Sequence, residues 1–501
     1  MSLASLYMIC LDRIYGFLKE GMWKSCIPNP FSDLPTEAVN DLMDISDDKN
    51  DYTKIGDVLL LLTSGRLTRL DIRPFDPKAE RDLIVSAIQK TGSICLRNIA
   101  PNSEEYIFHF VRNIIFWNPY LEEFHSEVHP GSDVFLKCPN LRVLKIYDSF
   151  KEFPVNNAPI DLSVLSSLRN LEILHVFNMD TDTIANVLET CPKLISIGLS
   201  DSLDSLEEIA QRRQKNSLLN LDVDRHFQLR RCVWGEKCRS GNLKKRQEYN
   251  SRFGGTIRSA VEFCPLVQEL IIHVHQKDGY EALRCLKQLT LLRIHFENFL
   301  GDFLPDFVEV LQEIGPQLKH LSVFGKEEPS SRNEGVPVDV ICDCCPDLQS
   351  LQIWSSIFMK DSSKSSCDLA LKRLRLYVLE PDDDEAECLL FLLSNSKQLE
   401  ELYLESVESL DDTLLNQIFE RNPFTQLKVC CIEESGVTKE GFQMFLKKSV
   451  SIETILILAD GQHFYDAKSL FNDANIRYSK DFHTSVKLKE FFYCHLNEKR
   501  F

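Results

Sequence analysis

A short pattern of leucine and other aliphatic residues returns along most of the chain and limits what it can fold into more than any other feature. The pattern is Leu-x-x-Leu-x-Leu, with Ile or Val allowed at the last position, and successive copies lie about 20 to 30 residues apart. Clear copies begin at Leu67, Leu141, Leu171, Leu194, Leu289, Leu318, Leu348, Leu371 and Leu399. Weaker copies begin near Ile94 and at Leu121, Leu218, Val267, Leu427 and Ile452. So many copies in register disfavour chance clustering of leucines in a two-domain α/β protein.

Each copy has the alternation of a short β-strand, and apolar residues between copies have helical spacing. The segments 180–190, 411–421 and 437–448 each carry an Asp or Thr near their start that suits a helix N-cap. A strand and a helix that repeat at this period stack into a leucine-rich repeat solenoid with one parallel sheet. The sequence therefore predicts an α/β horseshoe, with the sheet on its concave face and helices on its convex face.

Composition and charge restrict the classes of partner. Among 501 residues, 75 are acidic and 57 are Lys or Arg, so the formal net charge is −18. This charge opposes general attraction to nucleic acid and to anionic lipid. Apolar runs such as 58–62 and 388–393 are far shorter than the roughly 20 residues that span a membrane. We therefore expect neither nucleic acid nor a membrane as a partner.

Cysteine usage points to a reducing compartment. The 17 cysteines are scattered, and many lie inside apolar segments. This pattern indicates buried, reduced thiols in the cytoplasm and/or nucleus rather than a disulfide framework.

Four repeats begin with Cys-Pro just before the strand, at Cys138, Cys191, Cys264 and Cys345. A small Cys suits the crowded end of a helix, and Pro ends the helix. From about Cys138 to Ile457, the chain resembles the cysteine-containing leucine-rich repeats of F-box and related ubiquitin-ligase substrate receptors. The second cysteine and the Ile-Thr-Asp turn of that family are mostly absent here, so the repeat class is better supported than the subclass.

The apolar stretch from Ser5 to Ile14 lacks the basic segment and unbroken apolar core of a secretory leader, so we expect it to be retained. On a helix, Leu6, Cys10 and Ile14 share one side. A small residue and Leu, then Cys four residues on and an aliphatic four beyond, resembles the elongin-C-binding box. In that family the Leu fills an apolar pocket of elongin C, and the small Cys lets the helix lie close.

Leu34-Pro35 opens a second predicted helix, since Pro is tolerated in a first helical turn. The stretch is similar to the cullin box that follows an elongin box, and also to the start of an F-box, which binds a Skp-type adaptor. Both boxes ahead of leucine-rich repeats resemble the Zyg/Zer family of cullin-RING substrate receptors. We do not expect the armadillo-like repeats with which that family reads N-terminal degrons, so this specificity is not carried over.

A capping helix is the alternative, because a repeat array needs an N-terminal cap over its first repeat. In that case the chain is a protein-interaction scaffold without a ligase role, and Leu6, Cys10 and Ile14 only close the array. We predict a helical box at 1–50, repeats over 51–480 and a C-terminal tail or cap at 481–501.

The concave face offers a candidate binding stripe. The residue after the third apolar position of each copy faces solvent there, and most of these residues are aromatic or imidazole. Aromatic and Arg side chains dominate binding hot spots, so the stripe is predicted to bind a target protein or peptide. Ordinary stacking down the sheet is the alternative. The candidate residues at this position are Tyr147, Phe177, His273, His295, Phe324, Trp354 and Tyr377, and Arg293, Arg375 and Tyr403 lie alongside them, two residues earlier in their copies.

A basic insertion at about 224–258 lies between two strand copies. It can contact an acidic partner or clamp a substrate, but a solvated loop is favoured. Cys232 and Cys238 with His226 lack zinc spacing, and Cys342–Cys345 combines a predicted helix with a Cys-Pro start, so no metal site is predicted. The acidic run 381–387 is expected to be solvated at the start of a helix.

The sequence has no phosphate-binding glycine loop, metalloprotease motif or G-x-S-x-G elbow, so neither catalysis nor a cofactor is predicted. The resemblance of both boxes and of the repeats to ubiquitin-ligase receptors implies a non-catalytic substrate-recognition subunit of a cullin-RING ubiquitin ligase. Its expected partners are elongins B and C with a cullin, or a Skp-type adaptor, and an unidentified target protein. Such a subunit accelerates ubiquitin transfer by holding a target near the charged conjugating enzyme.

Overall fold

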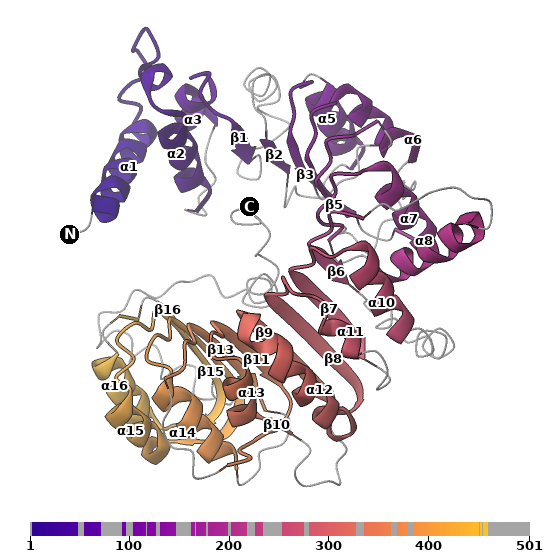
Figure 1. Cartoon of the computed structure of the whole chain (residues 1–501). Coiled ribbons are helices and arrows are strands. Elements are labelled where there is room, and N and C mark those ends of the chain that lie inside the picture. The colour runs from indigo at the N-terminus through magenta and orange to yellow at the C-terminus, as the bar shows by residue number, and fades with distance from the viewer. Residues whose placement is uncertain are drawn as a thin grey trace. The chain divides into compact units, whose positions relative to one another are not determined.

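The computed structural model describes most of the repeat region and the N-terminal helices (Figure 1). The described residues are 3–48, 55–71, 93–96, 104–116, 118–126, 131–146, 162–165, 167–176, 179–198, 202–217, 226–233, 253–274, 280–326, 335–361, 368–378, 384–449, 451–452 and 454–458. The chain divides into two compact units, each described here by itself. They are Met1–Asn216 with Phe227–Leu229, and Ser217–His226 with Arg230–Phe501.

The first unit begins with a helical module. It contains α1 (Leu3–Lys19), the 3-10 helix η1 (Pro30–Asp33), α2 (Thr36–Asp48) and α3 (Ile55–Leu62). α1 packs on α2 and α3. Leu11, Tyr15 and Leu18 recur at helical spacing and form the buried stripe of α1, and Val39 and Leu42 of α2 are fully buried. The module thus has a core of its own.

A parallel sheet follows in the first unit, and its strands pair in chain order. They are β1 (Arg69–Asp71), β2 (Ser93–Leu96), β3 (Glu123–Ser126), β4 (Val143–Ile146) and β5 (Ile173–Val176). The connecting and following helices are α5 (Glu104–Phe116), η2 (Ser132–Lys137), α6 (Leu162–Leu165), α7 (Thr181–Thr190) and α8 (Ser202–Ser217). Ser196 continues the array as an isolated parallel bridge to Ile173. Each of these strands coincides with a copy of the leucine pattern.

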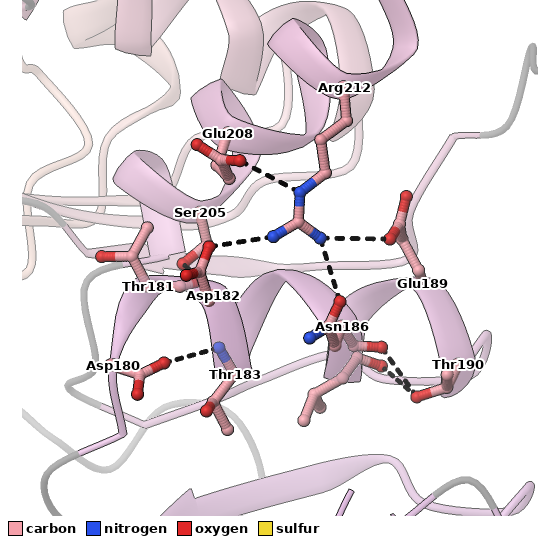
Figure 2. Close-up of polar contacts among 11 residues, drawn as sticks. Asp180, Thr181, Asp182, Thr183, Asn186, Glu189, Thr190, Ser205, Glu208 and Arg212 are labelled. Atoms are coloured by element: carbon pink, nitrogen blue, oxygen red, sulfur yellow. Dashed lines mark hydrogen bonds and ion pairs between the residues drawn. The ribbon is translucent and has the colours of Figure 1, made fainter. Parts of the chain in front are cut away.

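Arg212 of α8 joins this helix to α7 (Figure 2). Its guanidinium donates to Asp182 and Asn186 of α7, both at 2.9 Å, and to Glu208 of its own helix at 3.0 Å. Glu189 lies 3.7 Å away. These charge-assisted bonds hold α8 against the preceding repeat.

The second unit contains a nine-stranded parallel sheet within the described residues, in which neighbours in space are neighbours in the array. Its strands are β6 (Arg231–Val233), β7 (Glu269–Val274), β8 (Leu291–Phe299), β9 (His320–Lys326), β11 (Ser350–Trp354), β13 (Arg373–Tyr377), β14 (Glu401–Asp411), β15 (Val429–Gly436) and β16 (Thr454–Leu458). The short strands β10 (Val336–Pro337) and β12 (Ile357–Phe358) pair separately.

The helices of the second unit stack beside one another along one side of this sheet (Figure 1). They are α10 (Phe253–Phe263), α11 (Tyr280–Leu283), α12 (Leu300–Ile314), η4 (Gly315–Gln317), α13 (Val338–Cys344), α14 (Glu385–Asn395), α15 (Asp412–Arg421) and α16 (Lys439–Lys448). Alternate strand residues such as Leu351, Ile353 and Leu376 are buried beneath them. This arrangement is the α/β leucine-rich repeat fold. None of the helices in the described ranges has the length and hydropathy needed to cross a membrane.

The predicted N-caps of three helices are confirmed. The carboxylate of Asp180 accepts the Thr183 N–H at 2.7 Å at the start of α7. Asp411 caps α15 in the same way through the Leu414 N–H at 2.7 Å. The Thr438 hydroxyl accepts a longer bond of 3.3 Å from Gly441 at the start of α16. Each cap satisfies a backbone donor that the first helical turn leaves unpaired.

The Cys-Pro starts form a recurring turn between helix and strand. Cys138, Cys191, Cys264 and Cys345 are all buried, and the carbonyl of each accepts the N–H of the residue three positions on. The thiol of Cys138 lies 3.5 Å from the Asn118 carbonyl in the preceding repeat. Burial raises the pKa of Cys138 to about 12, so its thiol stays protonated and packs as a small apolar group.

The structure differs from three local predictions made from the sequence. Part of the predicted basic insertion is strand β6, in which Arg231 is buried and bonded to Glu269 of β7 at 2.6 Å. Glu385, expected in a solvated acidic run, is fully buried at the first position of α14. The Leu194 copy forms only the bridge at Ser196. The Leu218 copy, residues 234–252 and the predicted tail at 481–501 lie outside the described residues.

Candidate functional site

The first candidate surface is the side of α1 that carries the elongin-box residues. Leu6 is 51% exposed and Ile9 52% exposed, Cys10 is exposed, and Ile14 is half-buried. The buried stripe of Leu11, Tyr15 and Leu18 lies on another side of the same helix. The helix therefore has two apolar sides, of which the module covers one. We call Leu6, Ile9, Cys10 and Ile14 the α1 face.

The α1 face is carried on a well-fixed helix. The Tyr7 hydroxyl donates to Asp41 of α2 at 2.9 Å, which ties down the first turns of α1. At its other end, the ring of Phe17 meets Trp23 edge-on at 5.9 Å, and Trp23 meets the buried Phe31 at 5.5 Å. These contacts orient the α1 face before any partner arrives.

Leu34 and Pro35 lie where the second box is predicted. Leu34 is half-buried and closes η1, and Pro35 is exposed and directly precedes α2. The Pro35 carbonyl accepts the Val39 N–H at 3.2 Å, so Pro35 stands at the cap of α2 rather than inside its first turn. Asn29 anchors this corner, because its amide donates to the Leu60 carbonyl of α3 at 2.7 Å.

Exposed large apolar side chains concentrate in the helical module. Monomeric proteins keep contiguous patches of this kind small, and larger ones mark interaction surfaces. Among the described residues, those in the module are Leu6, Tyr7, Met8, Ile9, Met22 and Ile27, and those elsewhere are Phe116, Tyr120, Leu136 and Trp354.

The second candidate surface is the side of the nine-stranded sheet opposite its helices, which we call the open face. The strand register places one row of side chains on it, residue beside residue. A second row lies two residues earlier in each strand. The first row is His295, Phe324, Trp354, Tyr377, Glu405 and Glu433, and the second includes Arg293, Ser322, Gln352, Arg375, Tyr403 and Cys431.

The aromatic members of the first row form a continuous stack. The rings of His295 and Phe324 are parallel at 4.0 Å, Phe324 and Trp354 are 6.1 Å apart, and Trp354 and Tyr377 stack at 4.4 Å. Trp354 is 37% exposed, while the others are half-buried. The two sequence interpretations therefore coexist, because these rings pack on one another and still present a surface to solvent.

Arg293 is built into the stack. Its guanidinium lies over the Phe324 ring at 4.7 Å, and its Nε donates to His295 Nε2 at 2.9 Å. An imidazole nitrogen that accepts a hydrogen bond carries no proton, so this bond requires a neutral His295. The positive charge of Arg293 is spread over an aromatic face.

Carboxylates follow the aromatic stack along the same row. Arg375 donates to Glu405 at 2.8 Å, and both side chains are largely buried. Tyr403 bonds Glu401 weakly at 3.5 Å, and burial followed by the charge of Glu401 raises the pKa of Tyr403. Burial and the neighbouring charge of Glu405 raise the pKa of Glu433.

Three residues of the predicted stripe have side chains that the structure does not describe. Tyr147 and Phe177 are not among the described residues, and the side chain of His273 is not described although its backbone pairs with His295. The sequence pattern places Glu405 and Glu433 in the same row as the aromatics, but it could not reveal that Glu405 binds the predicted site residue Arg375.

The described residues contain no group of three or more His, Cys, Asp or Glu side chains arranged to hold a metal ion. In the described stretch of Cys342–Cys345, Cys342 and Cys345 are buried, and every cysteine whose side chain is described is a free thiol. The side chains described on the two candidate surfaces take part in apolar contact, stacking, hydrogen bonds and ion pairs.

No protein-family model matches the sequence, and no curated protein matches it either. Among solved structures, a leucine-rich repeat protein of Leptospira interrogans is 12% identical with a TM-score of 0.34, covering 79% of this chain and 91% of its own. A chain of the yeast Rad7 and Elc1 complex is 14% identical with a TM-score of 0.35, covering 88% and 96%. A Bacteroides fragilis protein is 16% identical with a TM-score of 0.32, covering 55% and 80%. Likenesses at this level do not transfer a function.

Proposed function

We propose that this chain is the substrate-recognition subunit of a cullin-RING ubiquitin ligase. In this proposal an elongin-C-type adaptor binds the α1 face, and a target protein binds the open face. The observation that carries the proposal is the exposure of Leu6 and Cys10 on a helix whose other apolar stripe is already buried.

The capping interpretation accounts for this exposure poorly. A helix that only closes an array packs its apolar side chains against the array, because covering them is its purpose. Here Leu11, Tyr15 and Leu18 meet the core of the module, while Leu6, Ile9 and Cys10 of the α1 face remain exposed among the described residues. Burying a Leu side chain is worth about 1.5 to 3 kcal/mol, so an apolar pocket on a partner would gain affinity here.

Leu34 and Pro35 support a second contact with the cullin. They lie between η1 and α2, and the contact of Asn29 with α3 fixes this corner in the same module that carries α1. The proposed role is non-catalytic, since positioning a target lysine near a charged conjugating enzyme raises the rate through proximity alone.

Co-expression of the full chain with elongins B and C tests the proposal. We expect a stable complex that Leu6→Ala weakens about tenfold or more and that Cys10→Phe abolishes, because a ring at Cys10 holds the partner away from the helix. Leu136→Ala is the matched control, since Leu136 of η2 is 53% exposed and lies outside the module. Unchanged melting temperatures exclude unfolding as the cause.

The alternatives give different results. A chain that ignores elongins but retains a Skp-type adaptor, with loss of binding in Leu34→Ala, is an F-box-type receptor. A chain that binds neither adaptor is an interaction scaffold, and the ligase proposal is then wrong.

A further inference from the structure

The open face changes character along its length. Its aromatic part ends with Trp354 and Tyr377 on β11 and β13, and Glu405 and Glu433 follow on the next two strands. Neighbouring strands lie about 4.8 Å apart, so the indole and the last carboxylate are roughly 14 Å apart in the sheet. A short extended peptide spans this distance.

In the part of the open face that follows the aromatic stack, the described carboxylates outnumber the arginines that pair with them. Arg375 binds Glu405 at 2.8 Å, and Arg373 lies 3.6 Å from Glu401. Among the described residues, Glu433 has no ion pair, and its carboxylate accepts a hydrogen bond from the weak thiol donor of Cys431 at 3.5 Å. A further positive charge beside Glu433 would therefore be stabilised.

The arginines of the open face already have intramolecular partners, so they are poorly placed to bind an acidic ligand. Arg375 is only 13% exposed and is already paired with Glu405. Arg293 is bonded to His295 and lies over the Phe324 ring. The uncompensated charge on this face is thus negative, in a chain whose formal net charge is −18.

We infer that the open face binds an extended peptide segment in which an aromatic or aliphatic side chain, placed on Trp354 and Tyr377, is followed by an Arg or Lys that reaches Glu433. This inference rests on the proposed function, because it names the class of target that the receptor takes. An arginine suits the site, since its guanidinium can bond a carboxylate while its plane stacks on an aromatic ring.

Three fluorescent peptides test the inference with the full chain. They share one tryptophan and differ only in whether the residues after it are arginine, glutamine or glutamate. Fluorescence anisotropy is expected to show the arginine peptide binding about tenfold more tightly than the glutamine peptide, with the advantage shrinking at high salt. Glu433→Gln removes the charge while keeping the shape, and is expected to reduce that advantage at least about threefold.

Two control variants distinguish a specific binding site from non-specific electrostatic attraction. Glu420→Gln makes the same change of charge on the exposed side of α15 and is expected to leave the arginine peptide's affinity unchanged. Trp354→Ala is expected to weaken the arginine and glutamine peptides alike. Equal losses in Glu433→Gln and Glu420→Gln would mean non-specific attraction and overturn the inference.

The remaining outcomes are also decisive. Preferential binding of the glutamate peptide, or no peptide binding at all, overturns the inference. Elongin binding, measured on the same Glu433→Gln protein, is expected to match the wild type. A wild-type chain that binds elongins but does not prefer the arginine peptide rejects only this inference, whereas a wild-type chain that shows the preference without binding elongins rejects the ligase role and leaves a receptor for basic segments.

Discussion

The indole of Trp354 stacks on the ring of Tyr377 at 4.4 Å, although more than a third of Trp354 is open to solvent. The two residues occupy equivalent positions on β11 and β13, and the parallel register brings them side by side. A ring held in this way loses little freedom when a ligand covers it, so the stack is pre-organised for binding.

Trp354→Ala is expected to lower the free energy of unfolding by less than the loss of a fully buried side chain, because the indole is already 37% exposed and its stacking on Tyr377 adds only roughly 0.5 to 1.5 kcal/mol to its burial. Leu376→Ala, one residue before Tyr377 but fully buried, is expected to cost about 2 to 5 kcal/mol. Urea unfolding of both variants measures this difference. Equal losses would assign Trp354 to the core and remove it from the binding surface.

Arg212→Ala is expected to loosen α8 from α7. Its ion pairs with Asp182 and Glu208 are partly exposed, so solvent screening limits the loss in stability to about 1 kcal/mol. Hydrogen exchange is expected to speed up in 202–217 while β4 and β5 stay protected. Lys397→Ala breaks one highly exposed pair with Asp368 and serves as the control, with no measurable effect expected. Unchanged exchange in α8 would show that packing alone holds this helix.

Glu385→Gln is expected to stabilise the protein at neutral and alkaline pH. Burial, together with the nearby charge of Glu408, raises the pKa of Glu385 in the folded state. The folded protein then holds this proton to higher pH than the unfolded chain, so stability is lost as pH rises towards the folded pKa. Thermal unfolding of variant and wild type is expected to converge near about pH 4, where both states are protonated. A variant that is less stable at pH 8 would contradict this.

The repeat architecture was predictable because strand and helix periodicities differ, and the leucines that mark each strand are the side chains buried beneath the helices. Leu351 and Ile353 illustrate this, as both belong to a predicted copy and both are buried. β6 escaped notice because its first residue is an arginine. Arg231 is tolerated inside only because Glu269 on the next strand neutralises it, and no local pattern announces such a pairing.

The candidate sites were predictable only in part. Helical spacing identified Leu6, Cys10 and Ile14 as one side of α1, but Leu11, Tyr15 and Leu18 form another apolar side. Only tertiary packing decides which of the two is covered. On the open face, the sequence placed Arg375 beside the aromatics, but the repeat pattern does not encode which side chain of the neighbouring strand its guanidinium bonds.

Alkylation of Cys10 tests the central claim most directly. Cys10 and Cys285 are both exposed, and Cys285 lies in the second unit, far along the chain from the α1 face. When elongins B and C are added to the full chain, iodoacetamide is expected to modify Cys10 about tenfold more slowly and Cys285 at an unchanged rate. An unchanged rate at Cys10 with saturating elongins would contradict the claim that this helix binds the adaptor.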